Sequence, residues 1–254
     1  YERVWVIGAV KGRAGSLKVL AGKILKKQKL LDRLVFTGNI VGPSYEGENF
    51  SAKAVDEALL LRSNFISNYA SDIDDVVFLR GQFEELLDKA RQLHISPNPK
   101  ELVEWMYSRG LDSILSSYGI SSNLLTTAAK NGALALSRAS VSIQEALVNK
   151  NGHYKYISSL KRLAYNEDRS VLVVSAGLAK DRPLEAQSDE LWWGGGFSNL
   201  DEPYGTIIKF IRGFDPEGKG LASGKYGITL DSGEEGVFAA LFSSDGRLLE
   251  TIQG

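Results

Sequence analysis

The feature that most constrains the fold is a set of short apolar runs, each ending at a glycine. Residues 4–8, 34–38 and 76–81 each contain such a run and the glycine that closes it. An apolar run of this length before a glycine is typical of a buried strand. Helical patterns separate the three runs, so the sequence predicts an α/β protein with a parallel sheet. Ligands of such sheets bind at the C-terminal ends of the strands.

The predicted helices follow from apolar spacing. Between Leu17 and Leu25 the apolar residues lie on one helical stripe, and Ser16 stands where an N-cap is expected. A second helix is predicted over residues 51–66, and residues 84–162 are mostly helical in pattern. Asp245-Gly246 is a hairpin signal. Further strands are predicted at 171–174, 206–211, 228–230, 237–242 and 247–252.

Composition narrows the function classes. The 254 residues are 43% hydrophobic, which is enough for one core, so we expect a single domain over residues 1–254 with a helical insert at about 84–165. A formal net charge of −1 gives no basic field for nucleic acid, and no apolar stretch approaches the roughly 18–20 residues of a membrane span. The absence of cysteine excludes disulfides and thiolate metal sites.

The glycine loops carry a set of ordered motifs. Residues 8–12 read Gly-Ala-Val-Lys-Gly, residues 38–44 read Gly-Asn-Ile-Val-Gly-Pro-Ser, and residues 79–84 read Leu-Arg-Gly-Gln-Phe-Glu. These loops resemble Gly-Asp-x-His-Gly, Gly-Asp-x-Val-Asp-Arg-Gly and Leu-Arg-Gly-Asn-His-Glu of the calcineurin-like metallophosphoesterases. Within that superfamily, the phosphoprotein phosphatases and symmetrical dinucleoside tetraphosphatases are most similar.

The resemblance continues to the C-terminus in the order of the family. Residues 116–119 are similar to its Ser-Tyr-Gly step, residues 175–177 to His-Ala-Gly, residues 213–215 to Gly-His-Thr and residues 230–233 to Leu-Asp-x-Gly. The resemblance implies a metallophosphatase-like αββα sandwich with a helical insert.

The departures from the family fall on its metal site. Two aspartates, an asparagine and three histidines hold two metal ions in the family, and Phe83 replaces its general-acid histidine here. The phosphate-holding Asp-Arg pair is replaced by Gly42 and Pro43. The resemblance therefore implies a pseudoenzyme with no catalytic residue, no bound metal and no cofactor. The six positions that match the metal ligands are Ala9, Lys11, Asn39, Gln82, Ser175 and Phe214.

Lys11 would lie inside the former cation pocket. Because burying a lone ammonium is costly, we expect its amine near a carboxylate, with Glu84 and Asp231 as the candidates, or near backbone carbonyls. Lys11 and Arg13, next to a predicted helix N-terminus, are candidate anion-binding residues. Inherited tight turns are the alternative interpretation of these glycine loops.

An aromatic, glycine-rich segment spans residues 192–197. Trp193 and Phe197 are candidate partner-binding residues, since aromatic anchors on loops are common at interfaces, and packing in the core is the alternative. His94 and His153 belong to no ligand-spaced cluster, so we expect structural roles for both.

These observations favour a catalytically inactive pseudophosphatase that serves as a protein-interaction, assembly or regulatory subunit of a larger complex. The second hypothesis is a sensor or carrier that binds a phosphorylated ligand at the remodelled pocket, and the third is a phosphohydrolase with an altered site. The resemblance makes the cytosol or an organelle stroma, such as that of chloroplasts, the expected compartment.

Overall fold

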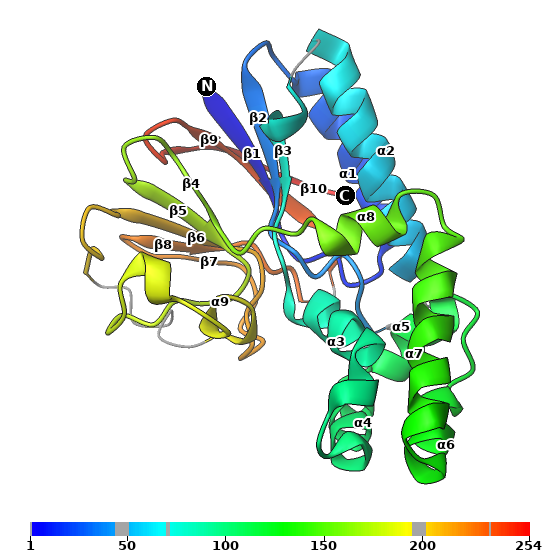
Figure 1. Cartoon of the computed structure of the whole chain (residues 1–254). Coiled ribbons are helices and arrows are strands. Elements are labelled where there is room, and N and C mark those ends of the chain that lie inside the picture. Colours follow the sequence, from blue (N-terminus) through cyan, green and yellow to red (C-terminus); the bar gives the residue numbers. More distant parts are fainter. Residues whose placement is uncertain (1, 44–50, 70–71, 195–201, 234) are drawn as a thin grey trace.

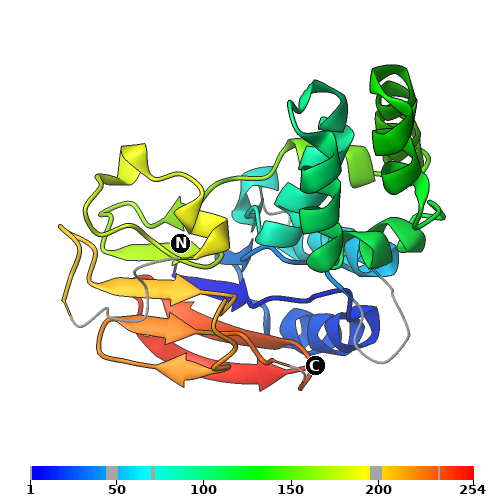
Figure 2. The same ribbon diagram turned by 90° about the horizontal axis from the view of Figure 1, so that it is seen from below.

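Two five-stranded mixed sheets form the centre of the molecule (Figures 1 and 2). The computed structural model describes residues 2–43, 51–69, 72–194, 202–233 and 235–254. The strands are β1 (Arg3–Ile7), β2 (Asp32–Phe36), β3 (Val76–Phe78), β4 (Ala164–Tyr165), β5 (Val171–Val174), β6 (Lys209–Arg212), β7 (Ala222–Ser223), β8 (Gly227–Thr229), β9 (Phe238–Ser243) and β10 (Leu248–Gln253).

The first sheet has the order β10-β9-β1-β2-β3, and the second has the order β4-β5-β6-β8-β7. β1, β2 and β3 are mutually parallel, as the alternation of strands and helices predicts. β9 and β10 are antiparallel and are joined through Asp245 and Gly246, where Gly246 has a φ of +80°. Gly246 therefore supplies the left-handed conformation that the tight turn needs. β3 is left at one edge of the first sheet.

Helices cover the first sheet and extend beyond it. The longer helices bury one apolar stripe each, as amphipathic surface helices do. The helices are α1 (Ala14–Lys27), α2 (Ser51–Tyr69), η1 (Ile73–Asp75), α3 (Gln82–Arg91), η2 (Leu93–Ile95), α4 (Pro99–Ser108), α5 (Leu111–Ser117), α6 (Leu124–Asn131), α7 (Ala133–Val148), α8 (His153–Ser158), η3 (Leu184–Ala186) and α9 (Glu190–Trp193).

The alternation of side chains along the strands creates separate apolar layers. Trp5 and Ile7 of β1 face α1 and α2, whereas Val4 and Val6 face the second sheet and contact a cluster that contains Ile211. On the outer face of the second sheet, Leu172 and Phe210 pack with Leu191 and Trp192 of α9. This layering is the predicted αββα sandwich.

The helices α3 to α7 form a lobe that projects from the sheets (Figure 1). Its buried side chains, such as Leu87, Met106 and Ile143, belong to the same apolar cluster as the residues beneath α1 and α2. The lobe is therefore packed onto the sandwich through a continuous core. In the part of the chain that the structure describes, none of the helices has the length and apolar character needed to cross a bilayer.

Two local predictions were wrong, and two short strands were not predicted. α1 begins at Ala14 with Arg13 as its N-cap residue, so Ser16 lies inside the first turn and cannot be the predicted cap. The strand predicted from residue 206 begins at Lys209. The two-residue strands β4 and β7 lack any period-2 pattern long enough to detect, and tertiary pairing alone produces them.

Candidate functional site

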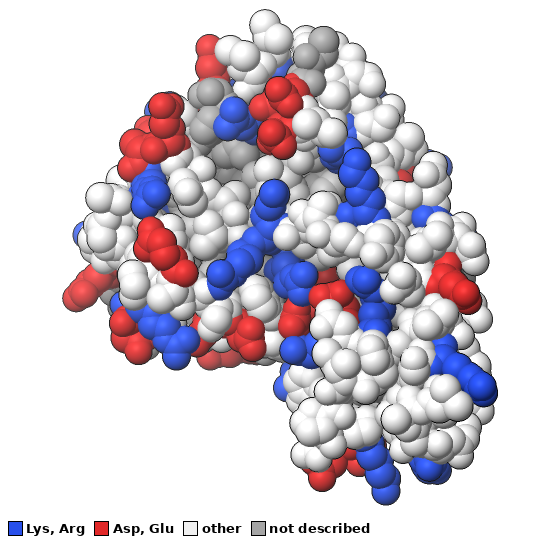
Figure 3. All heavy atoms as spheres, in the orientation of Figure 1, with Lys and Arg blue, Asp and Glu red and all other residues white. Residues whose placement is uncertain are grey.

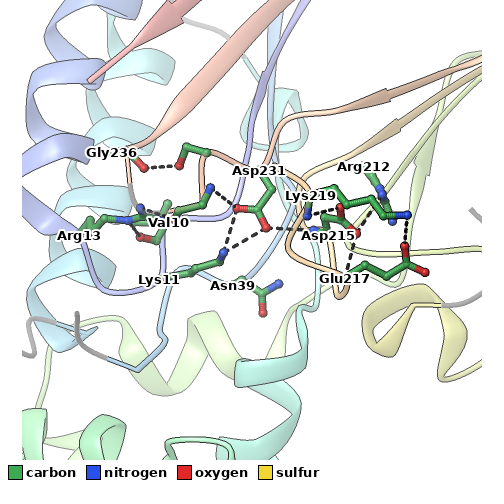
Figure 4. A network of polar contacts seen from close by, with 12 residues as sticks. Val10, Lys11, Arg13, Asn39, Arg212, Asp215, Glu217, Lys219, Asp231 and Gly236 are labelled. Carbon is green, nitrogen blue, oxygen red and sulfur yellow. Dashed lines mark hydrogen bonds and ion pairs between the residues drawn. The ribbon is translucent and has the colours of Figure 1, made fainter. Parts of the chain in front are cut away.

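Lys11 follows β1 and forms a buried ion pair with Asp231, a residue far from it in the sequence. Its Nζ lies 2.9 Å from Oδ1 and 3.0 Å from Oδ2 of Asp231, and the two side chains are 5% and 2% exposed (Figure 4). The backbone of Lys11 is left-handed, with a φ of +51°, which is unusual for a residue other than glycine. The pairing with a carboxylate is confirmed, and of the two predicted partners the fold selects Asp231.

Asp231 anchors a wider polar network (Figure 4). The backbone N–H groups of Asp215 and Gly233 each donate to its carboxylate at 3.0 Å. Asp215 in turn forms an ion pair of 3.1 Å with Arg212, whose Nε donates to Thr229 at 2.8 Å. Burial lowers the pKa of the Arg212 guanidinium, which the nearby carboxylates oppose. Sequence reasoning missed Arg212 and Asp215, although Asp215 ends one of the recognised motifs.

Apolar side chains close the other side of the Lys11 amine. Lys11 Nζ lies 4.9 Å from the centroid of the Phe214 ring, within the range of a cation–π contact. The Phe214 and Phe83 rings meet edge to face with centroids 6.2 Å apart. Ala9, Ala176 and Phe214 form a buried cluster of their own. Ala9 and Phe214, which the sequence resemblance matches to metal ligands, therefore make apolar contacts here.

Asn39 and Ser175 complete the arrangement. Asn39 has a φ of +55°, its Oδ1 accepts from the Phe83 N–H at 3.2 Å, and its Nδ2 lies 3.5 Å from Ser175 Oγ. Gln82, the first residue of α3, is only partly buried. The fold thus brings together the residues that we call the strand-end site, namely Ala9, Lys11, Asn39, Phe83, Ser175 and Phe214.

Glu84 holds the loop that carries Asn39. The Glu84 carboxylate is fully buried and accepts from the N–H groups of Asn39 and Ile40 at 2.7 Å each. It also accepts from the N–H groups of Val41 and Gly81 and, at 2.9 Å, from the Tyr156 hydroxyl. Burial raises the pKa of Glu84, and the hydrogen bonds from Asn39, Tyr156 and Ile40 act in the opposite direction. The sequence identified Glu84 only as the end of a motif and as a possible Lys11 partner.

The donor set of the strand-end site does not fit a divalent cation. Ala9 and Phe214 carry no lone pair to donate, and the Lys11 ammonium is itself a cation. A side-chain carbon added at Gly42, where the family has an aspartate, would lie 2.7 Å from the Lys11 Cα. Across the described ranges, no group of three or more His, Asp or Glu side chains is arranged to hold a metal ion.

Arg13, the second candidate anion ligand, is directed at backbone carbonyls. Its Nε donates to Val10 O at 3.0 Å, and its Nη1 donates to Gly233 O at 2.8 Å. The charge of Lys11 is neutralised by Asp231, whereas the Arg13 guanidinium bonds uncharged carbonyl oxygens. The use of Lys11 and Arg13 for anion binding stays a prediction.

Trp193 packs against the helical lobe. Its ring lies 5.3 Å from that of Trp105 on α4, and the Arg109 guanidinium lies over both rings, 4.9 Å from Trp105 and 5.4 Å from Trp193. Trp105 and Trp193 line an open hollow of about 510 Å³ together with Ile95 and Leu102. Ile95 is 70% exposed, so the hollow presents apolar surface. Phe197, the other predicted partner-binding residue, lies outside the described residues.

The two histidines make structural contacts. His94 Nδ1 lies 3.3 Å from Ser140 Oγ. His153 is buried, with Nε2 2.9 Å from Asp56 and Nδ1 3.0 Å from the Tyr118 hydroxyl. Burial lowers the pKa of His153, and the hydrogen bond to Asp56 counteracts this. These contacts tie α8 to α2 and the lobe, as expected for structural residues.

No protein-family model matches the sequence, and no curated protein is similar to it. Solved structures do match. A structure described as "a putative diadenosine tetraphosphatase" aligns with 100% of this chain and 94% of its own, with a TM-score of 0.54 and 18% identity. The chain has a metallophosphatase-like fold. A serine/threonine phosphatase from Saccharomyces cerevisiae with similarity to human phosphatase PP5 also aligns with 100% of this chain and 80% of its own, with a TM-score of 0.47 and 13% identity.

Proposed function

We propose that this protein is a pseudophosphatase that binds other proteins as an interaction, assembly or regulatory subunit of a larger complex. The observation that carries the proposal is the Lys11–Asp231 ion pair beneath the Phe214 ring. It supports the proposal because the sequence resemblance matches Lys11 to a metal-ligand position, and an ammonium already paired with a carboxylate cannot hold a cation.

The chemistry of the fold explains why this substitution matters. Phosphate ester hydrolysis by a two-metal site needs two cations about 3.5–4 Å apart, held by carboxylates, imidazoles and carbonyls. Ala9, Lys11 and Phe214 supply none of these groups, and restoring an aspartate at position 42 would displace the Lys11 backbone. The strand-end site is buried and internally paired, so it is stable without metal.

The partner surface that we propose is the hollow between α9 and the helical lobe. The hollow is lined by the predicted anchor Trp193 together with Trp105 and the exposed Ile95. Aromatic side chains provide large apolar area at low rotamer cost, which suits them to interfaces. The hollow lies on the side of the second sheet that α9 covers, and it uses none of the residues of the strand-end site.

The loss of catalysis is tested by elemental analysis and hydrolysis assays on the purified chain. We expect no stoichiometric manganese, iron or zinc and no turnover of p-nitrophenyl phosphate, phosphopeptides or dinucleoside tetraphosphates. Stoichiometric metal together with turnover that a chelator abolishes would show that the site is active. Binding of a phosphorylated ligand that is lost on substitution of Lys11 or Arg13 would instead favour the sensor or carrier hypothesis.

The interaction role is tested by capture from native extract followed by mass spectrometry. A Trp193→Ala/Phe197→Ala variant should bind the captured partner about 30-fold more weakly or worse, because one buried anchor typically contributes about 2–4 kcal/mol. Tyr165→Ala is the matched control, since Tyr165 is an exposed aromatic residue on β4. Unchanged affinity in a folded double variant would place the interface elsewhere. Imaging of a fluorescent fusion tests the proposed cytosolic or stromal location.

A further inference from the structure

A cavity of about 280 Å³ lies at the free edge of the first sheet, beside β3. β3 forms one wall, α2 and η1 form the next, and α8 with the segment after it closes the third. Its apolar lining includes Leu59, Val76, Phe78 and Tyr156. We call this cavity the edge pocket. Its volume is just below the roughly 300–1,000 Å³ that is typical of small-molecule sites, which suits a small ligand.

Three cations from separate elements line the edge pocket: Arg62 of α2, Lys155 of α8 and Lys161 before β4. None of the three side chains forms a hydrogen bond or ion pair with another residue that the structure describes. A single carboxylate, that of Asp74, also lines the cavity. Figure 3 shows Lys and Arg side chains gathered near the middle of this face, where β3 and α8 meet in Figure 1. The lining residues of the edge pocket therefore carry more positive than negative charge.

The position of Lys161 is fixed by the sheet. Its N–H donates to Phe78 O at 2.9 Å, and its C=O accepts from the Arg80 N–H at 2.8 Å, so the segment extends the edge of β3 by one bridge. Lys155 is on α8, which Tyr156 anchors through its hydrogen bond to the buried Glu84 carboxylate. The backbones that carry two of the three cations are thus held in place by hydrogen bonds within the fold.

We propose that the edge pocket binds a small phosphate monoester with an apolar or aromatic body. A phosphate monoester carries about −1.5 to −2 charges near pH 7 and three acceptor oxygens, which matches three cations opposed by one carboxylate. Arg62 can bond two of the oxygens at once through its planar fork, while the lysines act as point charges. The body of the ligand would lie against Leu59 and Phe78.

The convergence of the three cations on one cavity favours a small molecule over a macromolecule. An acidic protein segment or a nucleic acid would need the cations spread along an open surface, whereas here they converge from three elements on one cavity. This inference is independent of the pseudophosphatase proposal, because the pocket shares no residue with the strand-end site.

The test is calorimetric titration of the full-length chain with phenyl phosphate, in a chloride buffer of low ionic strength. The variant is Arg62→Gln/Lys155→Gln/Lys161→Gln. Its matched control is Lys18→Gln/Lys130→Gln/Arg138→Gln, which removes the same charge from exposed residues on α1, α6 and α7. Melting temperatures of both variants confirm that they are folded.

We expect the pocket variant to bind phenyl phosphate at least about tenfold more weakly, because it loses all three cations and their charge-assisted hydrogen bonds to the phosphate. The control variant should bind within about twofold of the parent, because none of its three residues lines the edge pocket. Inorganic phosphate should bind more weakly than phenyl phosphate, because it lacks the apolar body.

Amide chemical shifts locate the bound ligand independently. Phenyl phosphate should shift the signals of residues 76–78 and 152–161 in the parent protein and leave those of Lys11 and Asn39 in place. No binding by the parent protein, equal weakening in both triple variants, or shifts centred on the strand-end site would each overturn the proposal. Equal affinity for inorganic phosphate and phenyl phosphate would overturn the assignment of an apolar body.

Discussion

Lys11 in the strand-end site and the three cations of the edge pocket carry the same charge in opposite surroundings. Lys11 is 5% exposed and is bonded to both oxygens of Asp231, whereas Lys155 and Lys161 are exposed and unpaired among the described residues. A buried ammonium must be neutralised by the protein, but an exposed one is satisfied by water and stays available to a ligand. Lys11 is therefore a charge that stabilises the fold, whereas the cations of the edge pocket are available to bind an anionic ligand.

The largest effect is expected when the buried pair is broken. Lys11→Met should lower the free energy of unfolding by about 3–5 kcal/mol, because it leaves the Asp231 carboxylate buried without its partner charge. Chemical denaturation measures this loss. Lys27→Met is the matched control, since Lys27 forms an exposed ion pair with Glu250 whose loss should cost less than about 1 kcal/mol.

The double variant Lys11→Met/Asp231→Asn sharpens this result. Removing both charges should recover part of the stability that Lys11→Met loses, so the two substitutions should be non-additive. If Lys11→Met were no more destabilising than Lys27→Met, the ion pair would not stabilise the strand-end site, and the contrast with the edge pocket would fail.

A second prediction tests whether Glu84 holds the strand-end loop. Glu84→Gln should destabilise the fold by about 2–3 kcal/mol, because an amide group faces several N–H donors with only one acceptor oxygen. The variant Glu85→Gln is the control on the same helix, because Glu85 is bonded to side chains near the surface. Thermal or chemical denaturation compares the two, and equal losses would contradict the role given to Glu84.

A third prediction concerns pH. Burial lowers the pKa of His153 below its unfolded value of about 6.5, so the fold favours the neutral ring. The stability that this preference contributes is fully present above the unfolded pKa and is lost as pH falls through it. Between about pH 7.5 and about pH 5.5, the parent should lose more stability than His153→Gln does. An identical pH dependence in both proteins would contradict this.

The smallest effect is expected in the edge pocket. Lys155→Gln should change the free energy of unfolding by no more than about 0.5 kcal/mol, as is usual for an exposed residue without partners. Urea denaturation compares it with the parent protein. A loss of about 2 kcal/mol or more is what a hydrogen bond to a charged group contributes. It would mean that Lys155 stabilises the fold, and it would remove the distinction between the two regions.

The sequence by itself determined the fold class and the composition of the strand-end site. Apolar runs before glycines predict parallel strands, because strand length and turn chemistry are local properties, and the ordered motifs bring Ala9, Lys11, Asn39 and Phe214 to the same strand ends. The sequence also predicts that Lys11 is buried and therefore needs a carboxylate partner. It does not predict whether that partner is Glu84 or Asp231, because both carboxylates belong to strand-end motifs.

Only the tertiary structure decided that choice and created the edge pocket. Glu84 accepts from the backbone of residues 39–41, which leaves Asp231, 220 residues away in sequence, to pair with Lys11. Arg62, Lys155 and Lys161 share no motif and no periodicity. They converge only because α2 and α8 pack beside the edge of β3, and long-range packing of this kind leaves no local pattern in the sequence.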